Sequence, residues 1–316
     1  MATQVQAPPA TTMAGSARGG VVLDEAFLAR LERLHYLTRL VVLGGMRGEK
    51  RAKRHGSSIE FADYRQYSKG DDLRRVDWKV YARTDRYYTK LFYEEEDLTV
   101  HLLVDCSASM GFGSPAPKFH YALKAAAALG YIALANMERV RLRAFADRLL
   151  PDDTGYLRSK SATFKAFRFL EAQRVLPRVA TDFQKSLQTF AAQNKSRGLV
   201  IIVSDFLAPE GIFEGIKRVL HAGHQVFCFQ VLDPLELEPD LRGELKLIDV
   251  ETGAEREVTI SPKLLKMYRA YKDAYLEQLE STCRRLGMGY LRCTTRDPLE
   301  DTVLRGLLQT RIVGRG

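Results

Sequence analysis

The stretch Leu98-Thr-Val-His-Leu-Leu-Val-Asp-Cys-Ser-Ala-Ser-Met110 decides both the fold class of this chain and the position of its candidate site. Its first half is an almost unbroken apolar run, typical of a strand buried on both faces of a parallel sheet. Asp105 ends that run, and Ser107 and Ser109 follow at intervals of two. In an extended chain these three side chains point the same way, and the residues between them point back into the protein.

One carboxylate and two hydroxyls at the end of a buried strand suit a hard cation such as Mg²⁺ or Mn²⁺, which prefers oxygen ligands. Open α/β sheets also bind their ligands beyond the carboxyl ends of the strands. Asp and Ser are common in turns and helix caps as well, so a purely structural role for the three residues stays open at this point.

A second apolar run, Leu199-Val-Ile-Ile-Val-Ser-Asp205, also ends in an aspartate. From residue 98 onward, strand patterns alternate with helix patterns, which predicts an α/β fold with a doubly wound, mainly parallel sheet. We expect strands over 139–146, 148–150, 225–232 and 289–294, a hairpin over 243–260, and helices over 118–138, 161–175, 209–222, 262–286 and 298–311.

The N-terminal part of the chain divides into two segments before the α/β domain of 98–316. Residues 1–20 are rich in Ala, Thr, Pro and Gly and are expected to be a disordered tail without a signal peptide. Residues 21–97 are expected to pack on the core as a helical and irregular segment, with a helix over 24–42. The basic cluster Arg47 to Arg54 fits either a solvated loop or a phosphate-binding arm.

Residues 56–97 mix aromatic side chains with charges of both signs. Four aspartates nearly balance the basic side chains, and they would repel a polyanion, so the segment disfavours nucleic acid as a partner. Arginine forks that hold aspartates explain the mixture better. We therefore expect internal ion pairs, with Trp78 largely buried as an anchor.

Composition is that of a globular protein, with 316 residues, 46% hydrophobic residues and a formal net charge of +9. The longest apolar run, 125–137, is shorter than the ~20 residues of a membrane span. The four cysteines lie in apolar or helical patterns and are expected to be reduced core residues. We expect a cytoplasmic protein, with membrane association through a partner left open.

In a sheet wound outward from the Asp105 strand in both directions, the strand that ends in Asp205 lies beside it. Both carboxylates then face one crevice. Thr181 lies on the loop into the intervening helix and could reach the same crevice, although its spacing to Gln184 also fits a helix-capping box.

Asp105-x-Ser107-x-Ser109, with a downstream threonine and an aspartate that closes a later strand, resembles the metal-ion-dependent adhesion site of von Willebrand factor A-type domains. Together with Phe61-Ala-Asp-Tyr-Arg-Gln-Tyr and Gly70-Asp-Asp-Leu-Arg-Arg-Val-Asp-Trp, it resembles the bacterial family known as domain of unknown function fifty-eight. The resemblance extends from about residue 40 to the end of the chain. The family usually has glycine before the threonine, where this chain has Ala180.

The resemblance implies a cation site of Mg²⁺ or Mn²⁺ whose ligands are Asp105, Ser107, Ser109, Thr181 and Asp205. It also implies a protein-interaction module rather than an enzyme, one that accompanies a MoxR-type AAA+ ATPase in chaperone-like remodelling or maturation of other proteins. A carboxylate from that ATPase or from a client protein would complete the shell of the ion.

Two other functions remain as alternatives. A metal-dependent phosphoesterase would need a general base or nucleophile near the ion, and Cys106 is expected to point away. A basic nucleic-acid-binding protein is weakened by the balanced acids of 56–97.

Overall fold

The structure is a computed structural model that describes residues 21–22, 24–45, 60–69, 71–93, 99–208, 210–251 and 253–310. The expected tail of 1–20 and the basic cluster Arg47 to Arg54 lie outside these residues. The chain divides into two compact units. The α/β unit holds the described residues of 21–45 and 99–310, and the small unit holds those of 60–93.

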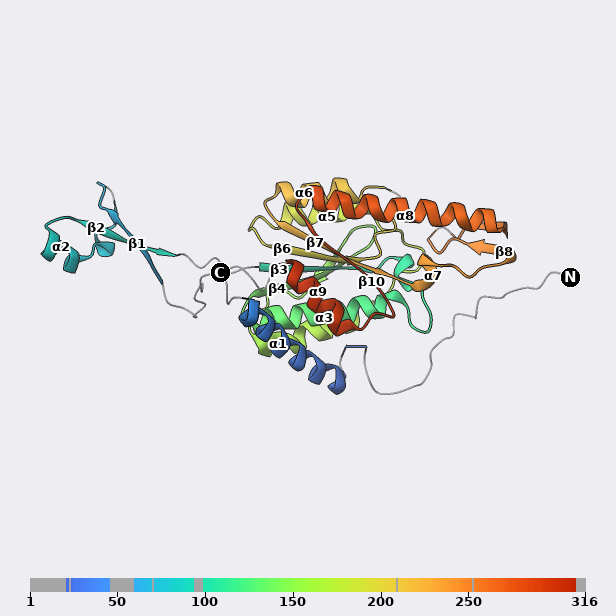
Figure 1. Ribbon diagram of the computed structural model, residues 1–316, viewed down its shortest axis with the longest axis horizontal. Coiled ribbons are helices and arrows are strands. Elements are labelled where there is room, and N and C mark those ends of the chain that lie inside the picture. Colours follow the sequence, from blue (N-terminus) through green and yellow to red (C-terminus); the bar gives the residue numbers. More distant parts are fainter. Residues whose placement is uncertain are drawn as a thin grey trace. The chain divides into compact units, whose positions relative to one another are not determined.

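A six-stranded sheet with the order β10-β7-β6-β3-β4-β5 forms the centre of the α/β unit (Figure 1). Every neighbouring pair is parallel except β4 with β5, which is antiparallel. The predicted doubly wound, mainly parallel α/β class is therefore confirmed. The strands are β3 (Thr99–Asp105), β4 (Arg139–Phe145), β5 (Leu149–Asp153), β6 (Leu199–Ser204), β7 (Gln225–Leu232) and β10 (Gly289–Thr294).

The winding direction reverses between β3 and β6. The chain leaves β3 for β4 on one side, and later enters β6 on the other side of β3. Both strands are buried along their whole length, as their apolar runs predict. Their register pairs Val104 with Val203, so Asp105 comes level with Ser204 at the carboxyl ends of the two strands. We call this end of the sheet the carboxyl edge.

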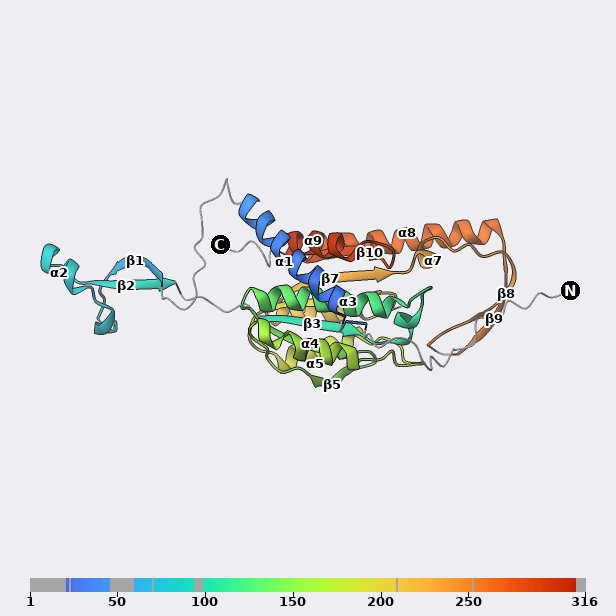
Figure 2. The ribbon, with the colours of Figure 1, turned by 90° about the horizontal axis from the view of Figure 1, so that it is seen from below.

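Helices cover both faces of the sheet (Figure 2). Alternate strand residues point to opposite faces, so Leu102 and Val104 join one apolar core while Leu103 joins the other. The first core is completed by α1 (Glu25–Gly45), α3 (Lys118–Ala135), α4 (Thr163–Ala172) and α9 (Leu299–Thr310). The second is completed by α5 (Phe183–Gln193), α6 (Ile212–His221) and α8 (Pro262–Arg285).

Helix α1 belongs to the α/β unit, whereas we expected residues 21–97 to form one segment. Its apolar residues recur at helical spacing, and Phe27, Leu31 and Leu34 are buried in the first core. The boundary between the two units therefore lies after α1, and the small unit begins beyond it.

The predicted hairpin forms from β8 (Gly243–Ile248) and β9 (Glu255–Ile260), and a short helix α7 (Pro234–Leu237) precedes it. Helix α6 starts at Ile212, three residues later than expected. In the described part of the chain, no helix is long and apolar enough to cross a membrane.

The small unit pairs β1 (Glu60–Gln66) with β2 (Tyr88–Tyr93) and adds a 3-10 helix, η1 (Leu73–Arg75), and helix α2 (Trp78–Thr84). The expected internal ion pairing is present, since Arg65 Nη2 lies 2.6 Å from Asp71 Oδ1. Asp77 is buried and caps α2 by accepting from the backbone N–H groups of Lys79 and Val80.

The small unit does not bury Trp78 as we predicted, because 57% of this residue is exposed within it. Trp78 is the first residue of α2, and its ring meets Tyr81 and Tyr87 edge-on within the small unit. The buried position that we assigned to Trp78 is taken by the preceding residue, Asp77. The packing of this unit on the α/β unit stays a prediction.

Candidate functional site

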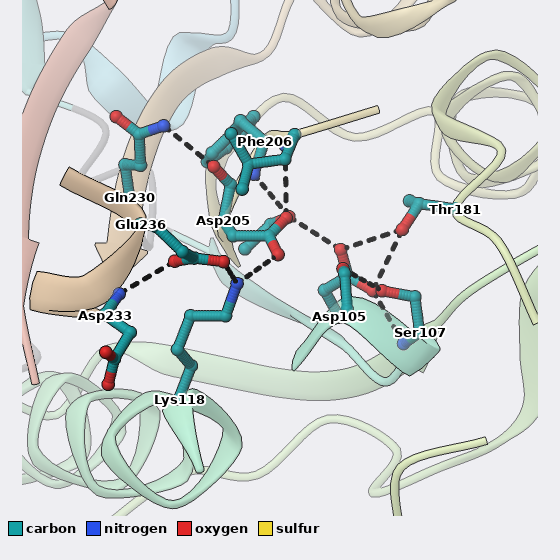
Figure 3. A network of polar contacts seen from close by, with 12 residues as sticks. Asp105, Ser107, Lys118, Thr181, Asp205, Phe206, Gln230, Asp233 and Glu236 are labelled. Carbon is teal, nitrogen blue, oxygen red and sulfur yellow. Dashed lines mark hydrogen bonds and ion pairs between the residues drawn. The ribbon is translucent and has the colours of Figure 1, made fainter. Parts of the chain in front are cut away.

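Four of the predicted site residues meet at the carboxyl edge of the sheet, namely Asp105, Ser107, Thr181 and Asp205 (Figure 3). Asp105 is the last residue of β3 and is fully buried. Its Oδ1 accepts from the backbone N–H of Ser107 at 2.9 Å, and its Oδ2 accepts from the hydroxyl of Ser204 at 2.6 Å. The sequence did not single out Ser204, although the strand register places it beside Asp105.

Ser107 and Ser109 converge, but not through the extended chain that their spacing assumed, because Ser109 lies in a helical turn. The extended chain continues through Ser107, and a short 3-10 helix, η2 (Ala108–Gly111), follows it. The Oγ atoms of the two serines lie 3.2 Å apart. Cys106, Ser107 and Ala108 are all buried.

Thr181 reaches Asp105 from the loop before α5. Its hydroxyl donates to Asp105 Oδ2 at 3.2 Å, with Oδ1 at 3.4 Å. The alternative interpretation of Thr181 as a helix cap is wrong, because α5 begins at Phe183 and Asp182 caps it by accepting from Lys185 N. The side chain of Thr181 therefore faces the crevice.

Asp205 follows β6 in the same crevice, but its carboxylate is held by a lysine. Lys118 Nζ lies 2.7 Å from Asp205 Oδ2, while Asp205 Oδ1 accepts from Leu207 N. The backbone carbonyl of Asp205 accepts from the Gln230 amide on β7 at 2.7 Å. Asp205 is thus held by α3, by β7 and by the backbone of the residues that follow it.

Lys118 is the first residue of α3 and is fully buried. Its ammonium also contacts Glu236 Oε1 at 2.5 Å. Glu236 belongs to the capping box of α7, where its other oxygen accepts from Asp233 N. One ammonium therefore bridges the segments that follow β6 and β7 (Figure 3). Gly113 permits the preceding loop to pass close to Asp233, since a Cβ there would lie 2.8 Å from Asp233 Oδ2.

The two aspartates differ in their electrostatic surroundings. Burial, reinforced by the charge of Asp205, raises the pKa of Asp105 from 3.8 to about 6. Hydrogen bonds from Ser204 and Ser107 oppose that rise. Within the described residues, Asp105 has no ion-pair partner. Burial alone would lower the pKa of Lys118, but Asp205 and Glu236 raise it, so this side chain stays an ammonium.

The side chains around Asp105 fit a hard divalent cation. A buried carboxylate that has no cationic partner among the described residues accepts from the hydroxyls of Ser204 and Thr181, and the hydroxyls of Ser107 and Ser109 follow it in the chain. Oxygen ligands of this kind suit Mg²⁺ and Mn²⁺. No group of three or more His, Cys, Asp or Glu that could hold a metal exists in the described residues. The oxygen atoms around Asp105 come mainly from hydroxyl groups, whereas zinc sites are usually built from Cys and His.

A pocket of about 910 Å³ adjoins the crevice, with Thr181 in its wall. Its other walls come from the start of α6, from α8 and from the turn between β8 and β9. Leu207 and Tyr271 line it and are exposed, Tyr271 by 77%. Tyr275, also in the wall, donates a hydrogen bond to the carbonyl of Phe206, which fixes the segment after Asp205.

A known protein family matches most of this chain. The family described as "Protein of unknown function DUF58" matches residues 63–280. The chain belongs to this family. An uncharacterized Mycobacterium bovis protein, Mb1516, is 29% identical over 304 residues, which cover 93% of each chain. An uncharacterized Mycobacterium avium protein, MAV169, is 32% identical over 127 residues, which cover 40% of this chain and 74% of the other.

Two solved structures are similar to parts of the chain. The conserved hypothetical protein BatB from Bacteroides thetaiotaomicron has a TM-score of 0.42 at 14% identity, covering 67% of this chain and 97% of the other. An aerotolerance-related membrane protein from Bacteroides fragilis has a TM-score of 0.40 at 17% identity, covering 67% and 98%.

Proposed function

We propose that this chain is a metal-dependent protein-interaction module whose crevice at the carboxyl edge binds Mg²⁺ or Mn²⁺. Asp105, Ser107, Ser109 and Thr181 would hold the ion, with Asp205 beside them. When bound, the cation supplies a positive charge with an open coordination position, which an Asp or Glu of a partner protein can occupy.

One observation carries the proposal: a fully buried carboxylate without an ion pair in the described residues is surrounded by hydroxyls. Burying an uncompensated charge is costly, and proteins normally pair such a charge or use it to coordinate a metal. Asp205 shows the contrast, because Lys118 neutralises it at 2.7 Å. The unmet charge at Asp105 is where a cation is needed.

The adjoining pocket supports docking of a protein segment rather than of the ion alone. It shares Thr181 with the crevice, and it presents exposed apolar surface at Leu207 and Tyr271. Exposed apolar and aromatic side chains next to a polar site are typical of surfaces that bind other proteins. A partner could place a carboxylate at the crevice and an apolar side chain in the pocket.

By the family resemblance, we infer that the partner is a MoxR-type AAA+ ATPase, or a client protein of the pair, and that the pair remodels or matures other proteins in the cytoplasm. Cys106 is not suited to be the nucleophile that the phosphoesterase alternative requires. That thiol is fully buried, and burial raises its pKa well above its ordinary value.

The test is a titration of this chain with a MoxR-type AAA+ ATPase of the same organism, followed by biolayer interferometry in Mg²⁺ and then in EDTA. If a partner carboxylate and the cation share the site, each must strengthen the binding of the other by the same factor. We expect EDTA to weaken parent binding at least about tenfold, or 1.4 kcal/mol. Asp105→Ala should bind weakly in both buffers.

The matched control is Asp240→Ala, which removes an exposed aspartate from a loop outside the crevice. This variant should keep both the parent affinity and its dependence on Mg²⁺. Equal parent affinities in the two buffers would show that the crevice is not the docking site.

A further inference from the structure

Lys118 occupies a position that lysine normally avoids. It is fully buried, whereas lysine side chains are almost never buried unless they are paired. It is also the first residue of α3, where the partial positive charge of the helix dipole repels a cation. Two unfavourable effects therefore act on the same ammonium, and its two carboxylate contacts must offset both.

Those contacts connect Lys118 directly to the candidate metal site. Asp205 Oδ2 lies 2.7 Å from the ammonium, and Asp205 is one of the ligands that the sequence predicts for the cation. An oxygen at this distance from an ammonium is already in a charge-assisted hydrogen bond. A divalent cation that used Asp205 would have to share it with Lys118 or replace it.

Glu236 gives the ammonium a second anchor outside the predicted ligand set. Its Oε1 lies 2.5 Å from Lys118 Nζ, and its Oε2 is held by Asp233 N at 2.8 Å. Lys118 can therefore give up Asp205 without becoming an unpaired buried charge. This arrangement makes exchange between the ammonium and a divalent cation at Asp205 feasible.

We propose that Lys118 is an internal cation that competes with the divalent cation for Asp205 and so lowers the affinity of the crevice for metal. Metal loading then shifts the Lys118 ammonium toward Glu236. The proposal rests on the proposed function, because it assigns a regulator to the same cation site. Lys118 is a positioning residue here, since it acts on the ion through Asp205.

Isothermal titration calorimetry with MnCl₂ on the full chain measures the competition. Lys118→Met removes the ammonium and leaves Asp205 free, so we expect Mn²⁺ to bind at least tenfold more tightly than to the parent. Lys124→Met is the matched control, because it is the same substitution on the same helix, outside the crevice, and it should bind like the parent.

Two further variants keep the test decisive. Lys118→Met/Glu236→Gln removes the second carboxylate, in case the single variant does not fold, and should show the same gain. In Asp205→Asn, the further change Lys118→Met should no longer raise the affinity, because the contested ligand is gone. A gain that is unchanged in the Asp205→Asn background would assign Lys118 a general structural effect and overturn the proposal.

The remaining outcomes of the titrations also support or overturn the proposed competition. Binding of Mn²⁺ to Lys118→Met but not to the parent supports the competition. Equal or weaker binding to both Lys118 variants, or no binding to any form, overturns it. The proposed function fails separately, through equal Mn²⁺ affinities of the parent and Asp105→Ala or through partner binding that EDTA does not change.

Discussion

Asp105 and Asp205 end neighbouring strands at the switch point of the sheet, yet the chain treats their charges differently. Asp105 is surrounded by the hydroxyls of Ser204 and Thr181 and has no cationic partner in the described residues. Asp205 is held by the buried ammonium of Lys118. Both carboxylates are almost inaccessible to solvent. One of them is compensated within the chain, and the other has no compensating cation among the described residues.

The difference shows how a site can be stable and still be open to a ligand. The ion pair at Asp205 ties α3, β6 and α7 together, so it belongs to the fold as much as to the site. The hydroxyls around Asp105 are neutral, so they can share hydrogen bonds in the absence of metal and offer oxygen ligands in its presence. Substitutions at the two aspartates and their neighbours should separate these two roles.

Lys118→Met should destabilise the fold more than any substitution at Asp105 or Ser109. It leaves buried Asp205 and half-buried Glu236 without their cation, and breaking a buried ion pair by removing one partner costs about 3–5 kcal/mol. Urea denaturation followed by circular dichroism in EDTA measures the free energy of unfolding. Adding Asp205→Asn should restore part of the loss. A Lys118→Met protein as stable as the parent would show that the ammonium does not compensate these carboxylates.

The stability of the metal-free protein should depend on the protonation of Asp105. Its folded pKa of about 6 lies above the ordinary value of 3.8, so the folded state binds the proton more tightly than the unfolded state. Stability should therefore fall as the pH rises from about 4 to about 6, by about 3 kcal/mol at 1.36 kcal/mol for each pH unit. Urea titrations in EDTA across this range measure it. Asp105→Asn should lack this component, and an unchanged profile in that variant would place the titration elsewhere.

Mg²⁺ should stabilise the parent modestly. At ten times the dissociation constant, binding to the folded state alone contributes about 1.4 kcal/mol. Asp105→Ala should abolish this gain and still fold, because the apolar burial of β3 and β6 holds the core. Thermal melts with and without Mg²⁺ compare the two proteins. A melting shift in Asp105→Ala as large as in the parent would exclude Asp105 from the site.

Ser109→Ala should have little effect on the fold and a selective effect on binding. The substitution removes one neutral oxygen that lies 3.2 Å from Ser107 Oγ and leaves the carboxylates in place. We expect a change in unfolding free energy of about 1 kcal/mol or less. Affinity for Mg²⁺ and for the partner should fall together, by less than in Asp105→Ala. Calorimetry that shows full parent affinity would remove Ser109 from the ligand set.

The fold could be predicted from the sequence because its decisive strands carry strong signals. The apolar runs before Asp105 and Ser204 are buried on both faces, and their ends lie side by side as a doubly wound sheet requires. The pairing of Ser107 with Ser109 was predicted from an extended chain, whereas the structure brings the two hydroxyls together through the 3-10 helix that begins at Ala108. Thr181 could be placed near the crevice by topology, although its capping alternative could not be rejected from spacing alone.

The ion pair of Lys118 could not be predicted in the same way. Lys118 stands at the start of a helix, where nothing in the local pattern distinguishes a buried lysine from a solvated one. Its partners Asp205 and Glu236 are 87 and 118 residues away in the sequence. Burial within the small unit was misassigned for a related reason, since the pattern of residues 56–97 did not reveal that Asp77, a charged helix cap, is buried there while Trp78 is exposed.

Whether the buried carboxylate of Asp105 holds a divalent cation can be decided by electron paramagnetic resonance of Mn²⁺. Free Mn²⁺ gives a sharp six-line signal that is lost on binding, so a titration counts sites and gives their affinity. We predict one site in the parent, none in Asp105→Asn, and one unchanged site in the control Asp240→Asn. One Mn²⁺ bound with parent affinity by Asp105→Asn would show that the cation does not depend on this carboxylate.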